Sequence, residues 1–402
     1  MVVDRPAPAT RVRESFAVHP AVALTGPRQC GKTTLAHAIA AAVPQRTYFD
    51  LEAAVDRRRL QAPEQALGRL RGLVVIDEVQ RLPGLFETVR VLVDRSDNEA
   101  RFLLLGSASP ALIKGVSETL AGRVGLVDLA GFDLREVAAH PWRRLWLRGG
   151  FPRSYLAPGA RSSWLWRESF VRTFLERDIP QFGITIPAET LRRFWTMVAH
   201  YHGQTWNSAE LARALGASEG TARRYLDILA GAFMVRVLPP WFENLRKRQV
   251  KAPKVYVRDT GLLHTLLDVS REDDLAGHPK VGASFEGFAV EQLLATLETS
   301  NAYFWATHAG AELDLLVTRG GKRYGFECKL ADAPGTTRSM RVALDDLDLE
   351  HLWVVYPGDT AYPLDDRISV LPVADIPELA ASLGAGWDRT GSPGPADHTN
   401  IV

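Results

Sequence analysis

The sequence predicts an α/β protein of several domains that begins with a mostly parallel sheet carrying helices on both faces. From Ala21 to about Leu129, short β-rich runs alternate with helical patterns, namely AVALT, RTYFD, LVVID, RFLLLGS and VGLVDLA. A glycine-rich loop joins the first of these runs to a helix, and a helical block and a β-hairpin follow later. At 402 residues with 46% hydrophobic content, the chain is too long for one ordinary core.

Charge and composition narrow the classes of partner. The chain carries 48 basic and 47 acidic side chains, a net charge of +1, so nucleic acid or an anionic membrane must be bound locally if at all. No run approaches the roughly 18 apolar residues of a membrane span, and the N-terminus lacks the apolar stretch of a signal peptide. Cys30 and Cys328 are too few for a disulfide framework. We therefore expect a cytoplasmic protein without a membrane partner.

The loop after the first strand has the pattern of a phosphate-binding loop, or P-loop. The segment TGPRQCGKTT fits G-x-x-x-x-G-K-[ST] between the strand AVALT and the helix TLAHAIAAA, which is the setting that the pattern requires. Its glycines turn backbone N–H groups towards phosphate oxygens, Lys32 spans the β and γ phosphates, and the Thr33 hydroxyl reaches Mg²⁺. The expected ATP-binding residues are Gly26, Pro27, Arg28, Gln29, Cys30, Gly31, Lys32, Thr33 and Thr34, with Cys30 a packing residue.

The strand LVVIDEVQ supplies the acidic half of this site. Four apolar residues fill a buried strand and place Asp77 and Glu78 at its carboxyl end. Asp77 is expected to hold Mg²⁺ through water, and Glu78 to polarise the attacking water. Two adjacent carboxylates also occur as surface charge, but the lysine loop favours the catalytic interpretation.

Two further features bear on catalysis, each with an ordinary alternative. Ser107 and Ser109 follow the strand RFLLLGS, where either sensing of the γ-phosphate or a plain turn and helix cap fits. Arg123 precedes the next strand and is either an arginine finger for a neighbouring subunit, which implies a homo-oligomer, or part of a surface salt bridge.

These segments carry a resemblance. GPRQCGKTTLA, LVVIDEVQRLP, LLLGSAS, LAGRV, GGFP and the later KVYVRDTGLL resemble bacterial and archaeal AAA-type ATPases that end in a domain of unknown function related to restriction endonucleases. The resemblance runs from about residue 15 to about residue 375. It implies an ATPase whose cellular role is unsettled.

The middle of the chain resembles a winged helix-turn-helix. Asn207 or Ser208 caps a helix that Gly216 ends, and the next helix buries one face and turns Arg223 and Arg224 outward. The runs FMVRVLPP and KVYVRD are expected to pair around a basic wing that includes Lys254. The expected nucleic-acid contacts, with DNA favoured over RNA, are Arg223, Arg224, Arg246, Lys247, Arg248 and Lys251. A docking module with a solvated basic loop is the alternative.

A hairpin near the end predicts a second site. In AELDLLVTRGGKRYGFECKL, the Gly320–Gly321 pair makes a two-residue turn, so opposed residues have numbers that sum to 641. Asp314 then faces Glu327, and Glu312 faces Lys329, all on one sheet face. A divalent metal, Mg²⁺ or Mn²⁺, would relieve the repulsion, with Glu286 as a further ligand and Lys329 activating a metal-bound water.

That pattern resembles the D…(E)-x-K core of restriction-endonuclease-like nucleases. A salt-bridged face, with Glu312 on Lys329 and Arg323 nearby, is the structural alternative. A nuclease fold kept only for binding is a third interpretation.

The expected architecture is therefore an α/β protein with an N-terminal P-loop NTPase sheet, a middle winged helix and a C-terminal α/β restriction-endonuclease-like domain. The expected divisions are a P-loop AAA-type domain at 1–150, a connector at 151–188, a winged helix at 189–260, a nuclease-like domain at 261–385 and a disordered tail at 386–402. The leading interpretation is an ATPase that couples nucleotide state to nucleic-acid binding, with a nuclease site in the last domain. The alternative is an ATP-dependent switch for protein partners whose nuclease-like domain is inactive; a phosphotransferase ranks last.

Overall fold

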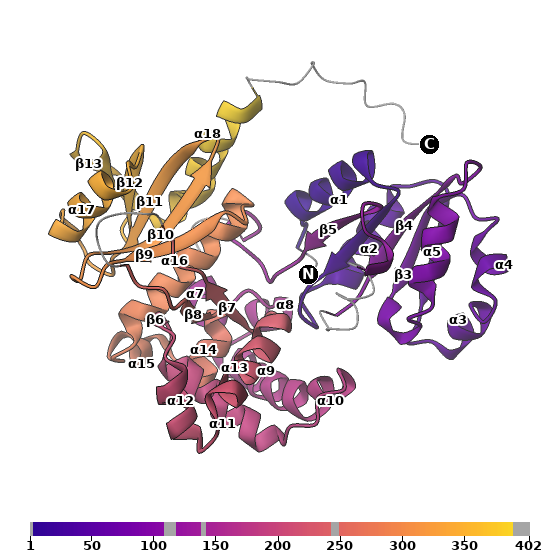
Figure 1. Cartoon of the computed structure of the whole chain (residues 1–402), viewed down its shortest axis with the longest axis horizontal. Coiled ribbons are helices and arrows are strands. Elements are labelled where there is room, and N and C mark those ends of the chain that lie inside the picture. The colour runs from indigo at the N-terminus through magenta and orange to yellow at the C-terminus, as the bar shows by residue number, and fades with distance from the viewer. Residues whose placement is uncertain (1–2, 108–117, 138–141, 243–248, 389–402) are drawn as a thin grey trace.

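The computed structural model describes residues 3–107, 118–137, 142–242 and 249–388, which form three lobes (Figure 1). The N-terminal lobe is built on a five-stranded parallel sheet in the order β2-β3-β4-β1-β5. Its strands are β1 (Ala21–Thr25), β2 (Arg46–Asp50), β3 (Gly72–Asp77), β4 (Ala100–Leu105) and β5 (Val124–Asp128). Every run predicted as a strand in this region is a strand, which confirms the parallel α/β sheet.

Helices cover both faces of this sheet because its strands are apolar on both faces. Along β1, Val22 and Leu24 join one buried cluster, whereas Ala21 and Ala23 join another on the opposite face. The covering helices are α1 (Pro6–Val18), α2 (Lys32–Ala41), α3 (Ala54–Arg59), α4 (Pro63–Leu67) and α5 (Leu85–Val93). The α2 helix follows the P-loop, as predicted, and begins at Lys32, two residues before the predicted start at Thr34.

The middle lobe is mainly helical and includes the segment predicted as a connector. Its first helices are α7 (Trp142–Arg148), α8 (Pro152–Tyr155), α9 (Ala160–Thr173), a π-helical turn (Phe174–Asp178) and α10 (Ile179–Gln181). Residues 151–188 therefore form packed structure, with Phe170, Phe174 and Ile179 buried. Their Trp and Phe side chains supply this core.

A small antiparallel sheet follows in the middle lobe. The elements are α11 (Ala188–His200), β6 (Gln204–Thr205), α12 (Ser208–Leu215), α13 (Glu219–Gly231), β7 (Val235–Leu238), β8 (Lys254–Val257) and α14 (Thr260–Leu266), and the strand order is β6-β8-β7. Asn207 caps α12 through the Glu210 amide, and Gly216 ends it in the left-handed region at φ 73°. Both boundaries of α12 match the sequence prediction.

Two motifs from distant parts of the chain lock together beneath this sheet. The Asp259 carboxylate accepts hydrogen bonds from the amides of Gly150, at 2.7 Å, and Leu262, at 2.9 Å. A Cβ on Gly149 would lie 2.1 Å from the Asp259 carboxylate, so only glycine fits there. The segments GGFP and RDTGLL thus have a structural role in joining α7 to α14.

The C-terminal lobe contains a six-stranded mixed sheet in the order β13-β14-β12-β11-β10-β9. Its strands are β9 (Ala302–Ala306), β10 (Glu312–Arg319), β11 (Lys322–Cys328), β12 (His351–Tyr356), β13 (Tyr362–Asp365) and β14 (Ile368–Pro372). The accompanying helices are α15 (Glu272–Ala276), α16 (Val281–Leu297), α17 (Arg338–Asp346) and α18 (Ile376–Asp388). Because α18 extends to Asp388, the first residues of the predicted tail are helical; residues 389–402 lie outside the described residues.

The β10–β11 hairpin has the predicted register over most of its length. Leu315 pairs with Phe326 and Arg319 with Lys322, and Gly320 and Gly321 both have positive φ, as a primed turn requires. The described pairing ends at Leu315, where β10 also shifts its register against β9. Glu312 pairs with Ala306 of β9, and neither of the predicted pairs, Glu312 with Lys329 and Asp314 with Glu327, belongs to the described ladder, so that part of the predicted register is wrong.

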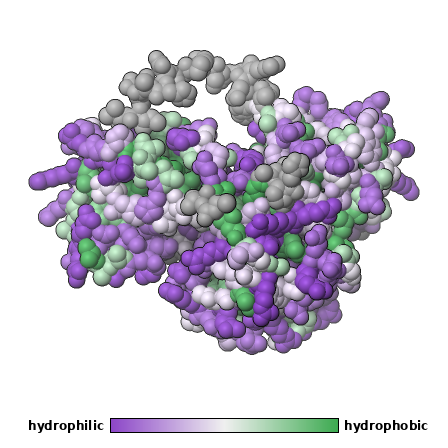
Figure 2. Space-filling view, turned by 180° about the vertical axis from the view of Figure 1, so that it is seen from behind, coloured by the Kyte–Doolittle hydropathy of each residue, from purple (hydrophilic) through white to green (hydrophobic). Residues whose placement is uncertain are grey.

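The three lobes share one apolar cluster. It extends from Leu24 in the N-terminal sheet through Trp195 in α11 to Phe326 in β11. Figure 2 shows hydrophobic residues mainly where the lobes meet and hydrophilic residues over the outer parts of this face. Within the described ranges, no helix is both long and apolar enough to cross a membrane.

Candidate functional site

The P-loop lies at the carboxyl end of β1 in a conformation that its glycines permit. Gly26 has a φ of 151° and Gly31 a φ of 102°, both in the region that disfavours other residues. A Cβ on Gly26 would lie 2.1 Å from the Leu129 carbonyl oxygen. Gly26 is therefore fixed by the close approach of the segment after β5, and Cys30 is fully buried as a packing residue.

The Lys32 ammonium is buried and bound to the loop itself. Its Nζ donates hydrogen bonds to the carbonyl oxygens of Gly26, at 3.0 Å, and Pro27, at 2.8 Å. These bonds hold the ammonium against the backbone of the loop, and phosphate oxygens are stronger acceptors than carbonyl oxygens because they are charged. The geometry fits the role predicted for Lys32.

Asp77 accepts three hydrogen bonds at the end of β3. One carboxylate oxygen accepts from the Thr33 hydroxyl and from the Tyr48 hydroxyl, each at 2.8 Å, and the other accepts from the Glu78 amide at 2.9 Å. The P-loop threonine and the acidic strand thus meet as predicted. Tyr48 was not predicted; it lies in the middle of β2, opposite Val75 of β3, and its ring stacks on His37 with centroids 4.3 Å apart.

Glu78 follows Asp77 in the left-handed backbone region. Its φ is 55°, which is uncommon for a residue with a side chain. Its carboxylate accepts a hydrogen bond from the side-chain amide of Gln80. Burial raises the pKa of Glu78 above its usual value, although Lys32 and Arg28 oppose this shift. A carboxylate with a raised pKa is a stronger base, as activation of water requires.

We expect Tyr48→Phe to weaken the use of Mg²⁺ by the N-terminal site. A hydrogen bond to a charged group contributes about 1.5–3 kcal/mol, so loss of the Tyr48 hydroxyl should raise the Mg²⁺ concentration for half-maximal ATP hydrolysis about tenfold. Titration of Mg²⁺ in a steady-state hydrolysis assay measures this shift. Tyr201→Phe, which removes only an exposed contact to Glu210, is the matched control. An unchanged Mg²⁺ dependence in Tyr48→Phe would contradict a positioning role.

The other residues predicted to act on the nucleotide differ in their placement. The Ser107 hydroxyl is buried at the carboxyl end of β4, and among the described residues it has no hydrogen-bond partner. Ser109 lies outside the described residues. Arg123 forms a salt bridge with Asp94 at 2.6 Å. It lies at the amino end of β5, and because β5 is parallel to β1, the P-loop lies at the opposite end of the strands. An arginine-finger role for Arg123 in a neighbouring subunit stays a prediction.

The P-loop is tied directly to the middle lobe. Arg28 donates to Asp178 in the π-helical turn at 2.6 Å and to Gln181 in α10 at 2.7 Å. Asp178 is largely buried, with its side chain 4% exposed. Sequence reasoning gave Arg28 only a general place in the loop and missed Asp178, which lies 150 residues away.

Arg5, the residue that precedes α1, joins the P-loop to the segment after β5. Its guanidinium makes a two-point ion pair with Glu136, at 2.6 and 2.9 Å, and donates to the Cys30 carbonyl oxygen of the P-loop at 3.0 Å. It also donates to the Gly131 carbonyl oxygen at 3.0 Å. Beside it, a cavity of about 570 Å³ lies between the three lobes, lined in part by Arg5, Pro27, Phe132, Phe151 and Phe233.

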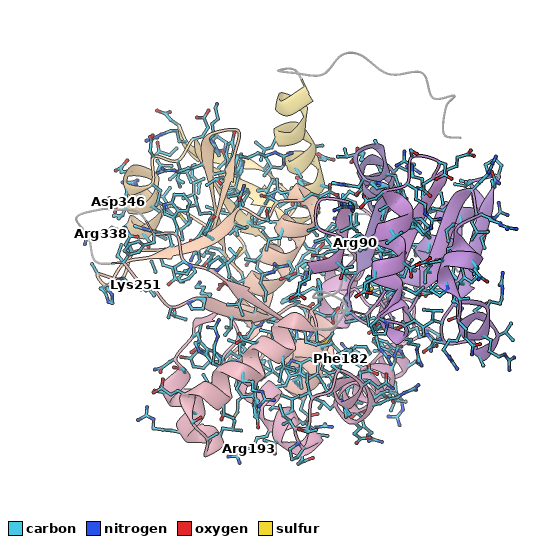
Figure 3. The ribbon with its side chains drawn as sticks, turned by 45° about the vertical axis from the view of Figure 1, so that its right-hand side comes forward. Arg90, Phe182, Arg193, Lys251, Arg338 and Asp346 are labelled. Carbon is cyan, nitrogen blue, oxygen red and sulfur yellow. The ribbon has the colours of Figure 1, made fainter. Side chains whose placement is uncertain are left out.

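The described residues predicted to contact nucleic acid lie on the surface. Arg223 and Arg224 are exposed on α13, with Arg223 bonded to Asp227 at 3.0 Å. Lys251 is exposed, projects outward in Figure 3, and lies 5.2 Å from the Phe242 ring. Arg246, Lys247 and Arg248 lie outside the described residues.

Lys254, expected on the exposed basic wing, is instead buried among carboxylates. Its side chain is 3% exposed, and its ammonium lies 3.1 Å from Glu286 and 3.2 Å from Asp314 and contacts Glu312 as well. The wing placement of Lys254 was wrong because all four residues of β8 are buried. Burial lowers the pKa of Lys254, but Tyr256 and the carboxylates raise it by more. The pKa is therefore above its usual value, and the ammonium stays charged.

The remaining members of the predicted second site lie beside this lysine. Glu327 is 6% exposed and pairs with Lys329 at 2.7 Å. One Asp314 oxygen accepts from the Cys328 amide at 2.9 Å. Burial and the Asp314 charge raise the pKa of Glu286 to about 7 and that of Glu327 to about 8. Lys329 is the partner of Glu327 here, in place of the predicted partner Glu312.

The predicted metal ligands of this second site are close together but are not arranged around a metal position. Across the described parts of the chain, no three acidic, His or Cys side chains form a group that could hold a metal ion. Glu286 and Asp314 converge on Lys254 instead. Metal binding by Glu286, Asp314 and Glu327 stays a prediction.

Family comparisons divide the chain into three matched segments. Residues 18–138 match an AAA domain, residues 139–273 match a domain of unknown function called DUF8612, and residues 281–376 match a domain of unknown function called DUF4143. The middle match includes the segments predicted as a connector and a winged helix. The first match bears out the AAA-type P-loop prediction.

Two curated relatives match nearly the whole chain. They are the uncharacterized proteins Rv2008c of Mycobacterium tuberculosis and Mb2031c of Mycobacterium bovis, each 51% identical over 376 residues, which cover 94% of this chain and 85% of the relative. Similarity to solved structures is lower. The Walker-type ATPase PABY2304 of Pyrococcus abyssi matches at 16% identity and a TM-score of 0.49, covering 66% of this chain and 96% of that structure. RuvB of Thermotoga maritima matches at 18% identity and a TM-score of 0.27, covering 59% and 90%.

Proposed function

Since this chain belongs to the same family as the mycobacterial proteins Rv2008c and Mb2031c and begins with an AAA-type P-loop domain, we propose that it hydrolyses ATP and couples its nucleotide state to nucleic-acid binding. The observation that carries the coupling is the contact of Arg28 with Asp178 and Gln181. Any movement of the P-loop on binding phosphate acts directly on the middle lobe through this contact.

The N-terminal residues have the chemistry that ATP hydrolysis needs. Lys32 and the loop amides would bind the phosphates, and Thr33 and Asp77 would hold Mg²⁺, which neutralises the charge that develops on the phosphates. Glu78 would accept a proton from the attacking water. The buried Ser107 hydroxyl has no partner among the described residues and supports a role in sensing the γ-phosphate, because a buried hydroxyl without a partner costs free energy unless a ligand satisfies it.

The middle lobe has the element order of a winged helix-turn-helix. Three helices and three strands follow one another in the order α11, β6, α12, α13, β7 and β8, and β8 pairs with both β6 and β7. In that arrangement the α13 helix corresponds to the one that enters a DNA groove, and its exposed residues include Arg223 and Arg224. This topology supports nucleic-acid binding through phosphate contacts, with DNA the favoured ligand.

Aromatic contacts connect the π-helical turn that contains Asp178, the partner of Arg28, with α13. Phe174 begins the π-helical turn that ends at Asp178, and its ring packs edge-on against Trp195 of α11 with centroids 5.3 Å apart. The neighbouring Phe194 packs against Tyr225 of α13 at 5.5 Å. Packed rings of this kind transmit small displacements because cores are close-packed.

Asp178→Asn tests this coupling. The P-loop and Arg28 remain intact in this variant, so we expect ATP hydrolysis without nucleic acid to change less than twofold. Stimulation of hydrolysis by duplex DNA should fall at least fivefold, because Arg28 loses its charged partner. Glu176→Gln, an exposed residue in the same turn, is the matched control and should keep the stimulation. Equal stimulation in Asp178→Asn and wild type would contradict transmission through Arg28.

The C-terminal lobe is a candidate for a second activity, metal-dependent cleavage of nucleic acid. Glu286 of α16, Asp314 of β10 and Glu327 of β11 lie in one buried cluster with Lys329 at its edge. Acidic oxygens suit Mg²⁺ or Mn²⁺, and a lysine beside the metal-bound water would assist its deprotonation. The occupation of this cluster by Lys254 equally supports a domain that binds without cutting.

A switch that acts on protein partners is the alternative from another class. It shares the N-terminal site and differs in the ligand of the middle and C-terminal lobes. Binding of labelled DNA or RNA that weakens with salt supports the nucleic-acid proposal. No binding at low salt would overturn that proposal and favour protein partners.

A further inference from the structure

We infer that the ring of Phe242 stacks on a base of single-stranded nucleic acid, with Lys251 and Arg338 binding the phosphates beside it. Phe242 and Lys251 both lie in the connection between β7 and β8, and together they are called the stacking platform. The inference rests on the proposed nucleic-acid function. It adds a strand type and a contact surface outside α13.

The exposure of Phe242 is the first observation. Among the aromatic side chains that the structure describes, that of Phe242 is the exposed one, at 60%, and the others are buried or half-buried. Single exposed apolar residues are common on protein surfaces, so exposure by itself indicates no ligand. The support behind the ring and the charges around it give the exposure its meaning.

The backbone beside both platform residues is anchored to β9, the edge strand of the C-terminal sheet. Trp241, which precedes the exposed ring, donates through its amide to the Phe304 carbonyl oxygen at 2.6 Å, and its indole packs edge-on against Tyr303 with centroids 5.0 Å apart. Val250, which precedes the platform lysine, donates to the Ala306 carbonyl oxygen at 2.9 Å. The platform is therefore held in place before a ligand arrives, which lowers the cost of ordering it on binding.

The platform lysine lies over the platform ring. The Nζ atom of Lys251 is 5.2 Å from the centroid of the Phe242 ring, a distance at which the π electrons attract the cation. The ammonium is thereby kept beside the ring while remaining exposed to solvent. A base stacked on this ring would have a positive charge beside it for its phosphate.

Arg338 adds a second exposed cation on the same side of the C-terminal lobe. Ala306, whose carbonyl oxygen binds the Val250 amide, pairs with Glu312 of β10. The backbone of Glu312 exchanges hydrogen bonds with the hydroxyl of Ser339, the neighbour of Arg338, at 2.7 and 3.1 Å. Figure 3 shows Arg338 and the platform lysine projecting from the left side of this lobe.

These groups fit a single strand of nucleic acid better than a duplex or a protein. Every base has a face that can stack on an aromatic ring, but in a duplex those faces are already stacked on each other. A protein interface needs an apolar centre of several residues, whereas here one ring lies among cations. The Glu312 carboxylate is paired with Lys254, so its charge is compensated and does not repel phosphate.

Phe242→Ala tests the stacking with two strands of equal charge. Fluorescence anisotropy at fixed salt compares a labelled thymidine strand of about 16 nucleotides with an abasic strand of the same length. Wild type should bind the strand with bases at least tenfold more tightly than the abasic strand, and Phe242→Ala should lose most of this difference. Leu165→Ala, which removes an exposed apolar side chain from α9, is the matched control and should bind as wild type does.

Two further variants distinguish stacking from a general loss of structure. Phe242→Trp keeps an aromatic face and should retain the preference for the strand with bases, which a residue needed only for folding would not explain. Lys251→Ala should make the dependence of log K on log salt shallower by about 0.7, as expected for one lost phosphate contact on a single strand. It should leave the preference for bases in place.

Duplex DNA separates this inference from the proposed function. Phe242→Ala should bind duplex DNA as wild type does, because paired bases do not reach the ring. Equal binding of the thymidine strand by Phe242→Ala and wild type would overturn the stacking and leave duplex binding by α13 standing. Failure of the wild type to bind either nucleic acid at low salt would overturn both proposals.

Discussion

Lys32→Ala should abolish ATP hydrolysis, with a fall in kcat/KM of at least a hundredfold. The Lys32 ammonium donates to two carbonyl oxygens of the loop and would donate to phosphate oxygens when ATP binds. A hundredfold loss corresponds to about 2.7 kcal/mol of transition-state stabilisation, within the range of one charge-assisted contact in a buried site. A coupled-enzyme assay measures turnover, and binding of a fluorescent ATP analogue measures affinity.

Glu78→Gln separates binding from chemistry at the same site. The amide keeps the size of the side chain but cannot accept the proton from water, so kcat should fall at least a hundredfold while ATP affinity stays within about threefold of wild type. Glu87→Gln on the exposed face of α5 is the matched control for Glu78→Gln, and Lys322→Ala, exposed at the start of β11, is the matched control for Lys32→Ala.

A Lys32→Ala protein with normal kcat/KM would contradict the assignment of the P-loop.

The second large effect is expected on nucleic-acid binding. Replacing both Arg223 and Arg224 with Ala removes two exposed positive charges from α13. Each lost phosphate contact lowers the dependence of log K on log salt by about 0.9, so the slope should become shallower by nearly two. We expect at least a tenfold loss of affinity for duplex DNA at 100 mM salt, measured by fluorescence anisotropy.

The control for this loss has the same change in net charge at a distance from α13. Arg58 of α3 and Arg90 of α5 are exposed on the N-terminal lobe, and Figure 3 shows Arg90 there. The Arg58→Ala/Arg90→Ala protein should bind DNA as wild type does. Similar losses in both double variants would mean that only net charge matters and would contradict a site on α13.

Features that arise from local spacing were predictable. The P-loop requires glycines at fixed positions, and the alternation of apolar strands with helices indicates a parallel sheet, so the N-terminal lobe was correctly predicted. The turn at Gly320 and Gly321 determined the register of the hairpin as far as Leu315. Such patterns depend on backbone geometry within a few residues.

Contacts between distant segments were not predictable in this way. Arg28 meets Asp178 from 150 residues away, and Lys254 meets Asp314 from 60 residues away. Spacing along a chain carries no signal at that separation. One local sign was available for Lys254: it begins KVYV, a strand apolar in its other residues, where burial could have been expected.

The sequence named the main residues of the candidate ATP site, which the structure brings together, but it did not name the residues that support them. Tyr48 and Arg5 position Asp77 and the P-loop through hydrogen bonds, yet neither belongs to a motif. The sequence predicts the strand that contains Tyr48. It does not predict that this strand, β2, lies beside β3, which carries Asp77. Supporting residues of this kind become visible when the sheet topology is known.

The most direct test of the account is the affinity of the Glu78→Gln protein for labelled duplex DNA with ATP and Mg²⁺, with ADP and Mg²⁺, and without nucleotide. Fluorescence anisotropy at fixed salt gives the three dissociation constants, and Glu78→Gln prevents loss of ATP during the measurement. We expect an affinity with ATP that differs at least fivefold from the affinity with ADP, and loss of this difference when Asp178→Asn is added. The same affinity in all three states would contradict the coupling of nucleotide state to nucleic-acid binding.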